Sequence, residues 1–181
     1  MKKFLSCLLT MLLFGAVPGV AQEYKPTDTG SAVQFEIKNF GFNTKGSFSG
    51  LDGKIVFDPQ HAAGASFDIT IDAATINTDN SMRDGHLKKD GYFDVEKYPR
   101  IRFLSTSVTG PDGTGHYILN GKLTIKATTK DISFPFVVTP LGDDLIFKGD
   151  FPLNRRDFDV GGSSTISNEL KVSLTVLAKK Q

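Results

Sequence analysis

Apolar and polar residues alternate with a period of two along much of the chain. In residues 31–39, Val33, Phe35 and Ile37 share one face of an extended segment, and polar side chains occupy the other face. This alternation is typical of a β-strand with one buried and one wet face, and it favours antiparallel pairing. The same pattern recurs in later segments, at residues 65–76, 115–125, 130–140, 143–153 and 169–180.

Short turn motifs separate these segments. LDGK, DPQHAAG, GPDGTG and LGDD place Gly, Pro or Asp where a tight reversal of the chain needs them. Regular short strands joined by such turns predict a sandwich or a barrel, and a closed barrel leaves no free strand edge. We therefore expect an all-β fold of about eight or nine strands, either a sandwich or a barrel.

One segment interrupts the strand pattern. Asp79 or Asn80 is a suitable helix cap, and the residues after them are acceptable in a helix, whereas Gly85 and Gly91 weaken it and then end it. The sequence predicts a short helical insertion near residues 80–89, with the next strand beginning near Arg100.

The first 21 residues have the pattern of a secretory signal peptide. Lys2 and Lys3 precede an apolar run, and small residues follow it as far as Ala21. We expect cleavage after Ala21 and a periplasmic or secreted product. The apolar run is too short for a stable spanning helix, and no later stretch of the sequence is long and apolar enough to span a membrane.

Residues 22–181 are expected to form one domain that is held together by its core alone. Cys7 is the only cysteine and lies in the predicted leader, so no disulfide is expected. Lys2 and Lys3 account for two of the 21 basic residues, and the rest nearly balance the 20 acidic residues. This balance argues against a nucleic-acid partner.

A cluster of charged residues opens the segment RDGHLKKDGYFDVEKYPRIRF. Ser81, Asp84 and His86 are the residue types of a catalytic triad, but side chains this close on a short helix seldom converge. No two histidines have the spacing of metal ligands, and DNSMRDG fails as a calcium loop because Arg83 falls at the third ligand position. We therefore predict no catalytic residues, no metal and no cofactor.

Phenylalanine dominates the aromatic residues. The chain has 15 phenylalanines and no tryptophan, and only Phe4 and Phe14 fall in the predicted leader. Because phenylalanine has no polar group, so many of them need an apolar interior. The inside of a small barrel is either filled by side chains or holds one ligand. Periodicity does not separate these alternatives, so a packed structural or interaction barrel stays open beside a ligand-binding one.

Ordered motifs across residues 24–179 resemble the YceI-like family of secreted bacterial lipid-binding proteins. GSFSG is followed by GKIVFD, and then by an Arg-Asp pair, His-Leu, Phe-Asp and YPRIRF within residues 83–103. GKLTIKATTKDISFPF and LNRRDFDVG are similar to later elements of the family. Two positions depart from the family pattern, because Asn39 stands where histidine is frequent and Asp159 where glycine is frequent.

The resemblance implies a lipocalin-like, extended antiparallel β-barrel of about eight strands, with the helical insertion near its mouth. It implies a long apolar cavity for a polyisoprenoid, an isoprenoid quinone or another long-chain amphiphile such as a fatty amide, which the protein would sequester or carry. A lipid-modifying enzyme is the less favoured alternative, and a homodimer is left open.

The expected site has an apolar lining and a polar mouth. The expected cavity residues are Phe35, Phe42, Phe48, Phe67, Ile69, Phe93, Phe103, Phe134, Phe136 and Phe147. The expected mouth or head-group residues are Arg83, Asp84, His86 and Arg155, with Arg83 and Asp84 anchoring the helix.

Overall fold

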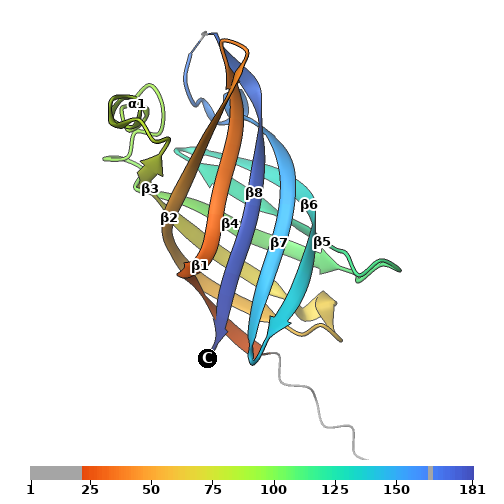
Figure 1. Ribbon diagram of the computed structural model, residues 1–181. Helices are drawn as coiled ribbons and strands as arrows, with labels where there is room; N and C mark the ends of the chain where they lie inside the picture. The colour runs from red at the N-terminus through yellow and green to blue at the C-terminus, as the bar shows by residue number, and fades with distance from the viewer. Residues whose placement is uncertain (1–21, 163–164) are drawn as a thin grey trace, which may run out of the picture.

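Eight antiparallel strands close into a barrel in the computed structural model, which describes residues 22–162 and 165–181 (Figure 1). Each strand pairs with its neighbours in sequence, and pairing between the first and last strands completes the ring. The strands are β1 (Gln22–Asn39), β2 (Phe42–Phe57), β3 (Ser66–Asn77), β4 (Arg100–Thr109), β5 (Tyr117–Ile125), β6 (Thr128–Leu141), β7 (Asp144–Asn154) and β8 (Ile166–Lys180). The predicted barrel is confirmed, and the predicted signal peptide lies outside the described residues.

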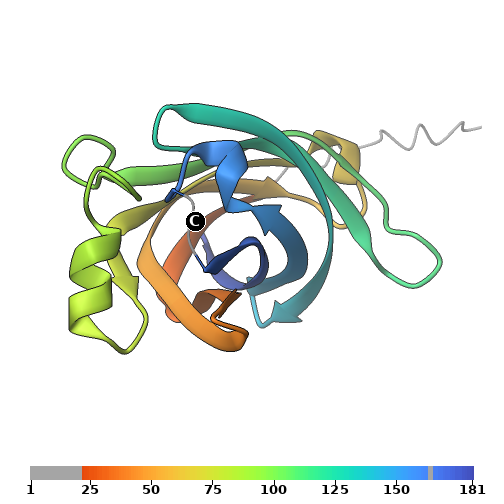
Figure 2. The ribbon, with the colours of Figure 1, turned by 90° about the horizontal axis from the view of Figure 1, so that it is seen from above.

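Three short helical segments lie between strands. They are η1 (Ala62–Gly64), α1 (Ser81–Leu87) and η2 (Arg155–Phe158). α1 is the predicted helical insertion, but it is shorter than expected because the chain leaves the helix at Lys88. Asn80 caps it, since its side chain accepts a hydrogen bond of 2.9 Å from the Arg83 N–H. Seen from above, α1 lies outside the ring of strands (Figure 2).

The two ends of the barrel differ (Figure 1). The upper end holds the β1–β2 turn, α1, η2 and the start of β8. The lower end holds the start of β1, the β6–β7 turn and the C-terminus. No helix among the described residues is long and apolar enough to span a membrane.

A bulge in β2 determines which of its side chains face the interior. Thr44 and Phe48 line the cavity before the bulge, whereas Leu51 and Ile55 line it afterwards, so the inward positions change from even to odd numbers. The register between β2 and β3 shifts between Ser49 and Asp52, where this change occurs.

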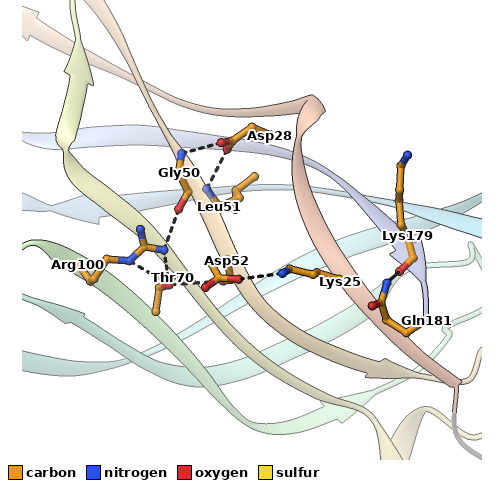
Figure 3. A network of polar contacts seen from close by, with 9 residues as sticks. All are labelled: Lys25, Asp28, Gly50, Leu51, Asp52, Thr70, Arg100, Lys179 and Gln181. Carbon is orange, nitrogen blue, oxygen red and sulfur yellow. Dashed lines mark hydrogen bonds and ion pairs between the residues drawn. The ribbon is translucent and has the colours of Figure 1, made fainter.

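Polar side chains hold the bulge in place on the outer side of the barrel (Figure 3). The Asp28 carboxylate accepts hydrogen bonds from the N–H groups of Gly50 and Leu51, at 3.0 and 2.8 Å. The Arg100 guanidinium donates to the Gly50 carbonyl at 2.8 Å and to the Thr70 hydroxyl at 2.5 Å. Backbone groups that the bulge takes out of the ladder thus regain partners.

Candidate functional site

The barrel encloses a cavity of about 270 Å³. Every strand contributes inward-facing side chains, α1 contributes Arg83 and Leu87, and η2 contributes Arg155. Most of the lining is aliphatic or aromatic. The volume is close to the lower end of the range of roughly 300–1,000 Å³ that is typical of small-molecule sites.

Aromatic rings close the lower end of the cavity. Phe57 is fully buried and meets Phe67, Tyr117 and Phe147 edge to face, with ring centroids 5.3–6.2 Å apart. Tyr117 stacks on Phe136 at 5.2 Å. Edge-to-face and stacked pairs at these distances pack densely. The lower end is therefore a packed core that bounds the cavity.

Phenylalanines also form the middle of the lining. Phe48 lies between Phe35 and Phe93, with centroid distances of 5.8 and 5.4 Å. On the other side, Phe134 lies between Phe103 and Phe151, at 5.9 and 4.5 Å. These rings reach across neighbouring strands and give the cavity an almost continuous aromatic wall.

Glycines opposite two of these rings let them lie close to the strands. A Cβ at Gly46 would come within 2.3 Å of the Phe35 ring, and one at Gly121 within 2.4 Å of the Phe103 ring. A larger residue at either position would push the ring into the cavity. The glycines therefore contribute to the free volume of the site.

Polar side chains gather at the upper end. Thr78 is buried, and its hydroxyl donates to Asp84 Oδ1 at 2.5 Å while it accepts from Arg83 Nε at 2.7 Å. Arg83 also donates to the Thr78 carbonyl, and the Thr78 N–H donates to Asp84. Arg83 and Asp84 thus anchor α1 to the end of β3 through Thr78, and of the two only Arg83 lines the cavity.

Asn39 is a second polar residue at the upper end. It is the last residue of β1 and lines the cavity in the same inward row as Val33, Phe35 and Ile37. Its Oδ1 atom is buried and, among the described residues, has no hydrogen-bond partner. A buried acceptor without a donor is costly, so this position favours a ligand or water that can donate.

Arg155 is buried where η2 leads toward β8. Its guanidinium donates to the carbonyls of Val160 at 2.7 Å and Ser167 at 2.9 Å, and to the Asn168 side chain at 3.2 Å. Burial, followed by repulsion from Arg156, lowers the pKa of Arg155 from its usual value. Arg155 lines the cavity, and these hydrogen bonds hold the β7–β8 connection together.

Besides Asp84, which lies outside the lining, two sequence-based expectations for the site need correction. Phe42 does not line the cavity; it is the first residue of β2, before the part of the strand that pairs with β3, and is 78% exposed. His86 also lies outside the lining; it is exposed, and its ring meets Tyr92 edge to face at 4.9 Å. The other expected apolar residues all lie in the lining. They are Phe35, Phe48, Phe67, Ile69, Phe93, Phe103, Phe134, Phe136 and Phe147.

Several lining residues were not expected from the sequence. Alternation along β1 could have identified Asn39, since it continues the inward row. Thr78 and Tyr92 give no comparable signal, because both lie where the strand pattern is interrupted. Leu51 was hidden by the bulge that changes the inward face of β2.

The charged groups of the described residues do not assemble a metal site. No group of three or more His, Cys, Asp or Glu side chains in residues 22–162 and 165–181 is arranged to hold a metal ion. Asp84 binds Thr78 and His86 contacts Tyr92, so these two side chains engage different partners.

A closed antiparallel barrel with an internal apolar cavity defines the lipocalin-like class of ligand-binding folds. The model of the YceI-like domain matches residues 24–178, and the chain belongs to this family.

Relatives and solved structures agree with this membership. The UPF0312 protein of Yersinia pestis (strain Pestoides F) is 32% identical over 146 residues, which cover 79% of this chain and 75% of that protein. The crystal structure of BcnA from Burkholderia cenocepacia superposes with a TM-score of 0.80 at 28% identity, covering 85% of this chain and 99% of that one.

A more distant structure shows the same fold. It is a polyisoprenoid binding domain from Saccharophagus degradans implicated in plant cell wall breakdown, with a TM-score of 0.70 at 15% identity. The match covers 87% of this chain and 98% of that domain.

Proposed function

We propose that this protein binds a long-chain isoprenoid, such as a polyisoprenoid or an isoprenoid quinone, inside the barrel and sequesters or carries it in the periplasm. The observation that supports this proposal is the shape and chemistry of the cavity. It is mostly apolar, it is closed by aromatic rings below, and the buried polar side chains Thr78 and Arg155, with Arg83, lie toward its upper end.

The chemistry of the cavity suits such a ligand. Each methylene that leaves water contributes roughly 0.8 kcal/mol, so a long hydrocarbon chain gains much by entering the phenylalanine-lined interior. At the upper end, Arg83 offers a positive charge and Asn39 offers a buried acceptor. These groups would orient a polar head toward the mouth. The polyisoprenoid binding domain of the same fold supports this class of ligand.

Lining residues are more exposed at the upper end than at the lower end, which supports entry of the ligand from the upper end. Around the upper end, lining residues such as Thr44, Arg83 and Leu87 are partly exposed, whereas Ile55 and Phe67 at the lower end are buried. A tail that enters first would therefore reach the packed lower core, with the head group left at the exposed end.

We propose binding rather than catalysis. The residue types that resemble a triad engage other partners, since Asp84 accepts a hydrogen bond from Thr78 and the His86 ring meets Tyr92. A nucleophile and its base need to lie within hydrogen-bonding reach of each other. Cavity binding accounts for the arrangement without a chemical step.

Lipid analysis of the purified protein tests this proposal. The protein is expressed in its own host, purified without detergent, and examined by native mass spectrometry and by organic extraction. A bound isoprenoid is expected as an added mass that extraction removes. A protein that is lipid-free on isolation and takes up no long-chain isoprenoid quinone on incubation would contradict the proposal. The variant Leu141→Ser changes an exposed residue outside the cavity, so it should carry the same bound isoprenoid as the parent.

A further inference from the structure

The most exposed large apolar side chains of the described residues lie at the upper end of the barrel. Phe40 and Phe42 are 72% and 78% exposed at the β1–β2 turn, and Met82 is 86% exposed on α1. Figure 1 shows the turn and the helix at the same end of the molecule. The other exposed large apolar residues, Leu104, Ile118 and Leu141, lie elsewhere on the barrel.

Phe40 is held in a backbone conformation that disfavours it. The turn between β1 and β2 consists of Phe40 and Gly41, with φ values of 50° and 81°. Two-residue turns with positive φ at both positions strongly prefer Asn, Asp or Gly, and a bulky side chain there is an outlier. The exposed ring gains no core burial in return. A strained residue with no packing benefit points to a role outside folding.

These apolar side chains border the mouth of the cavity. Asn39 and Thr44, on either side of the turn, both line the cavity. Arg83, next to Met82 in α1, lines it as well. Phe40, Phe42 and Met82 are thus exposed apolar side chains beside lining residues at the upper end of the site, and we call them the apolar rim.

The base of the hairpin carries basic side chains. Lys38 and Lys45 are exposed, and the one carboxylate in residues 34–48 is that of Glu36, which lies 3.8 Å from Lys45. Aromatic residues at a tip with lysines behind them are typical of protein segments that enter the interface of a bilayer. A narrow convex tip also offers little of the roughly 800 Å² per partner that a stable protein interface buries.

We infer that the apolar rim is a membrane-docking surface that inserts into the headgroup region of a lipid bilayer. Docking would bring the cavity mouth against the bilayer, so a lipid could pass between membrane and barrel without crossing water. This inference rests on the proposed function, because it assumes that the cavity accepts a lipid.

A single introduced tryptophan reports insertion, because the chain has none of its own. Phe42→Trp and the control Leu141→Trp, at the lower end, are made in the chain that starts at Gln22, which contains every strand of the barrel. Vesicles of phosphatidylcholine and phosphatidylglycerol are then added. We expect a blue shift and quenching by brominated lipid in the Phe42→Trp variant only. Equal responses in both variants, or none in either, would overturn the inference.

A double variant separates docking from folding. Phe40→Asn with Phe42→Ser should lower partitioning onto the same vesicles by roughly tenfold or more, since two phenylalanines are lost from the interface. The melting temperature should rise or stay unchanged, because asparagine tolerates the turn conformation. Unchanged partitioning would overturn the inference, as would concentration-dependent self-association that the same substitutions abolish.

Uptake in solution distinguishes the failure of this inference from the failure of the proposed function. If the double variant binds isoprenoid in the absence of vesicles as the parent does, but extracts it from vesicles more slowly, docking is supported. If the parent takes up isoprenoid in solution but shows no insertion into added vesicles, docking is overturned and the cavity function stays intact. Vesicle contact by a barrel that takes up no lipid would support the surface and contradict the cavity function.

Discussion

The size of the cavity depends on single residues opposite its aromatic wall. Phe35 pairs in register with Gly46, and its ring occupies the space that a side chain at that glycine would need. Cross-strand neighbours of this kind decide how near a ring lies to the sheet. The free volume at this level is thus a property of glycine positions as much as of phenylalanines.

Gly46→Ala should reduce both stability and lipid capacity. The new methyl group would lie 2.3 Å from the Phe35 ring and push it inward, at a cost of roughly 1–3 kcal/mol in the free energy of unfolding. Chemical denaturation and isoprenoid uptake measure the two effects. Gly113→Ala is the control, because a Cβ there meets no atom within 4 Å. Equal stability of the two variants would show that the ring moves freely.

Asp112 gives the β4–β5 connection a dependence on pH. Hydrogen bonds from the His116 N–H and from the Thr114 hydroxyl and N–H lower the pKa of Asp112 from 3.8 to about 2. A carboxylate with a lowered pKa in the folded state stabilises that state above the pKa of the unfolded chain, and this contribution is lost as pH falls toward about 2.

Amide NMR shifts of Thr114 and His116 should therefore report a transition near pH 2 rather than near pH 4. Asp112→Asn should remove that transition and loosen the connection at neutral pH, because all three hydrogen bonds end on Oδ1 and lose the negative charge that strengthens them. A midpoint close to the usual value of 3.8 would contradict the prediction.

At the scale of elements, the β2 bulge connects the outer polar contacts with the inner lining. Asp28→Asn should destabilise the barrel by roughly 1–2 kcal/mol, because one of two backbone N–H groups loses its acceptor. Asp52→Asn is a matched control in the same network (Figure 3). Its ion pair with Lys25, at 3.7 Å, is exposed and should contribute only about 0–1 kcal/mol.

Urea denaturation compares these two variants. If Asp28→Asn lowers the free energy of unfolding no more than Asp52→Asn does, the bulge does not depend on the Asp28 carboxylate. Hydrogen exchange at Gly50 and Leu51 should also quicken in the Asp28 variant, since these amides are the ones that donate to it.

α1 depends on one buried hydroxyl for its position at the mouth. Thr78→Val keeps the shape of the side chain but removes the hydroxyl that links Arg83 to Asp84, at a cost of roughly 1–3 kcal/mol. Hydrogen exchange should quicken in α1 and stay unchanged in β5. Ser81→Ala, at an exposed position of the same helix, is the control. Unaltered exchange in α1 would show that the helix is held by other contacts.

Elements with strict alternation could be predicted well from the sequence. The inward row of β8, formed by Leu170, Val172, Leu174 and Val176, lines the cavity as one face, as the period of two indicates. Alternation fails where the wall ends or the chain changes face. Phe42 shares its inward parity with Thr44 and Phe48, yet it lies past the end of the wall and meets solvent.

At the scale of the whole molecule, the site combines a closed apolar end with a polar open end. The apolar lining could be predicted because so many phenylalanines, which have no polar group, need an apolar interior. The polar end could not, because Thr78 acquires its role from the side chains of Arg83 and Asp84 on α1, which bind its hydroxyl, and spacing does not encode these contacts. Alternation along β1 places Asn39 in the inward row, but it does not show that its buried Oδ1 lacks a donor among the described residues.

Filling the cavity distinguishes a lipid carrier from a barrel with a packed core. Val172 lines the cavity and is paired in register with Phe35 on one side and Phe151 on the other. If the cavity is an open binding site, the new ring of Val172→Phe should lie in the free volume. The free energy of unfolding should then change by less than about 1 kcal/mol. Isoprenoid uptake should fall by roughly tenfold or more, because the ring occupies volume that the ligand needs.

A packed core would give the opposite pair of results. The added ring would be forced into filled space, and the free energy of unfolding would fall by roughly 1–3 kcal/mol. Urea denaturation and native mass spectrometry with an isoprenoid quinone measure both quantities on the same samples. Thr175→Phe adds the same ring on β8 outside the lining and should leave uptake unchanged. Reduced uptake in Val172→Phe, with stability retained, requires that the interior be space the protein keeps open for its ligand.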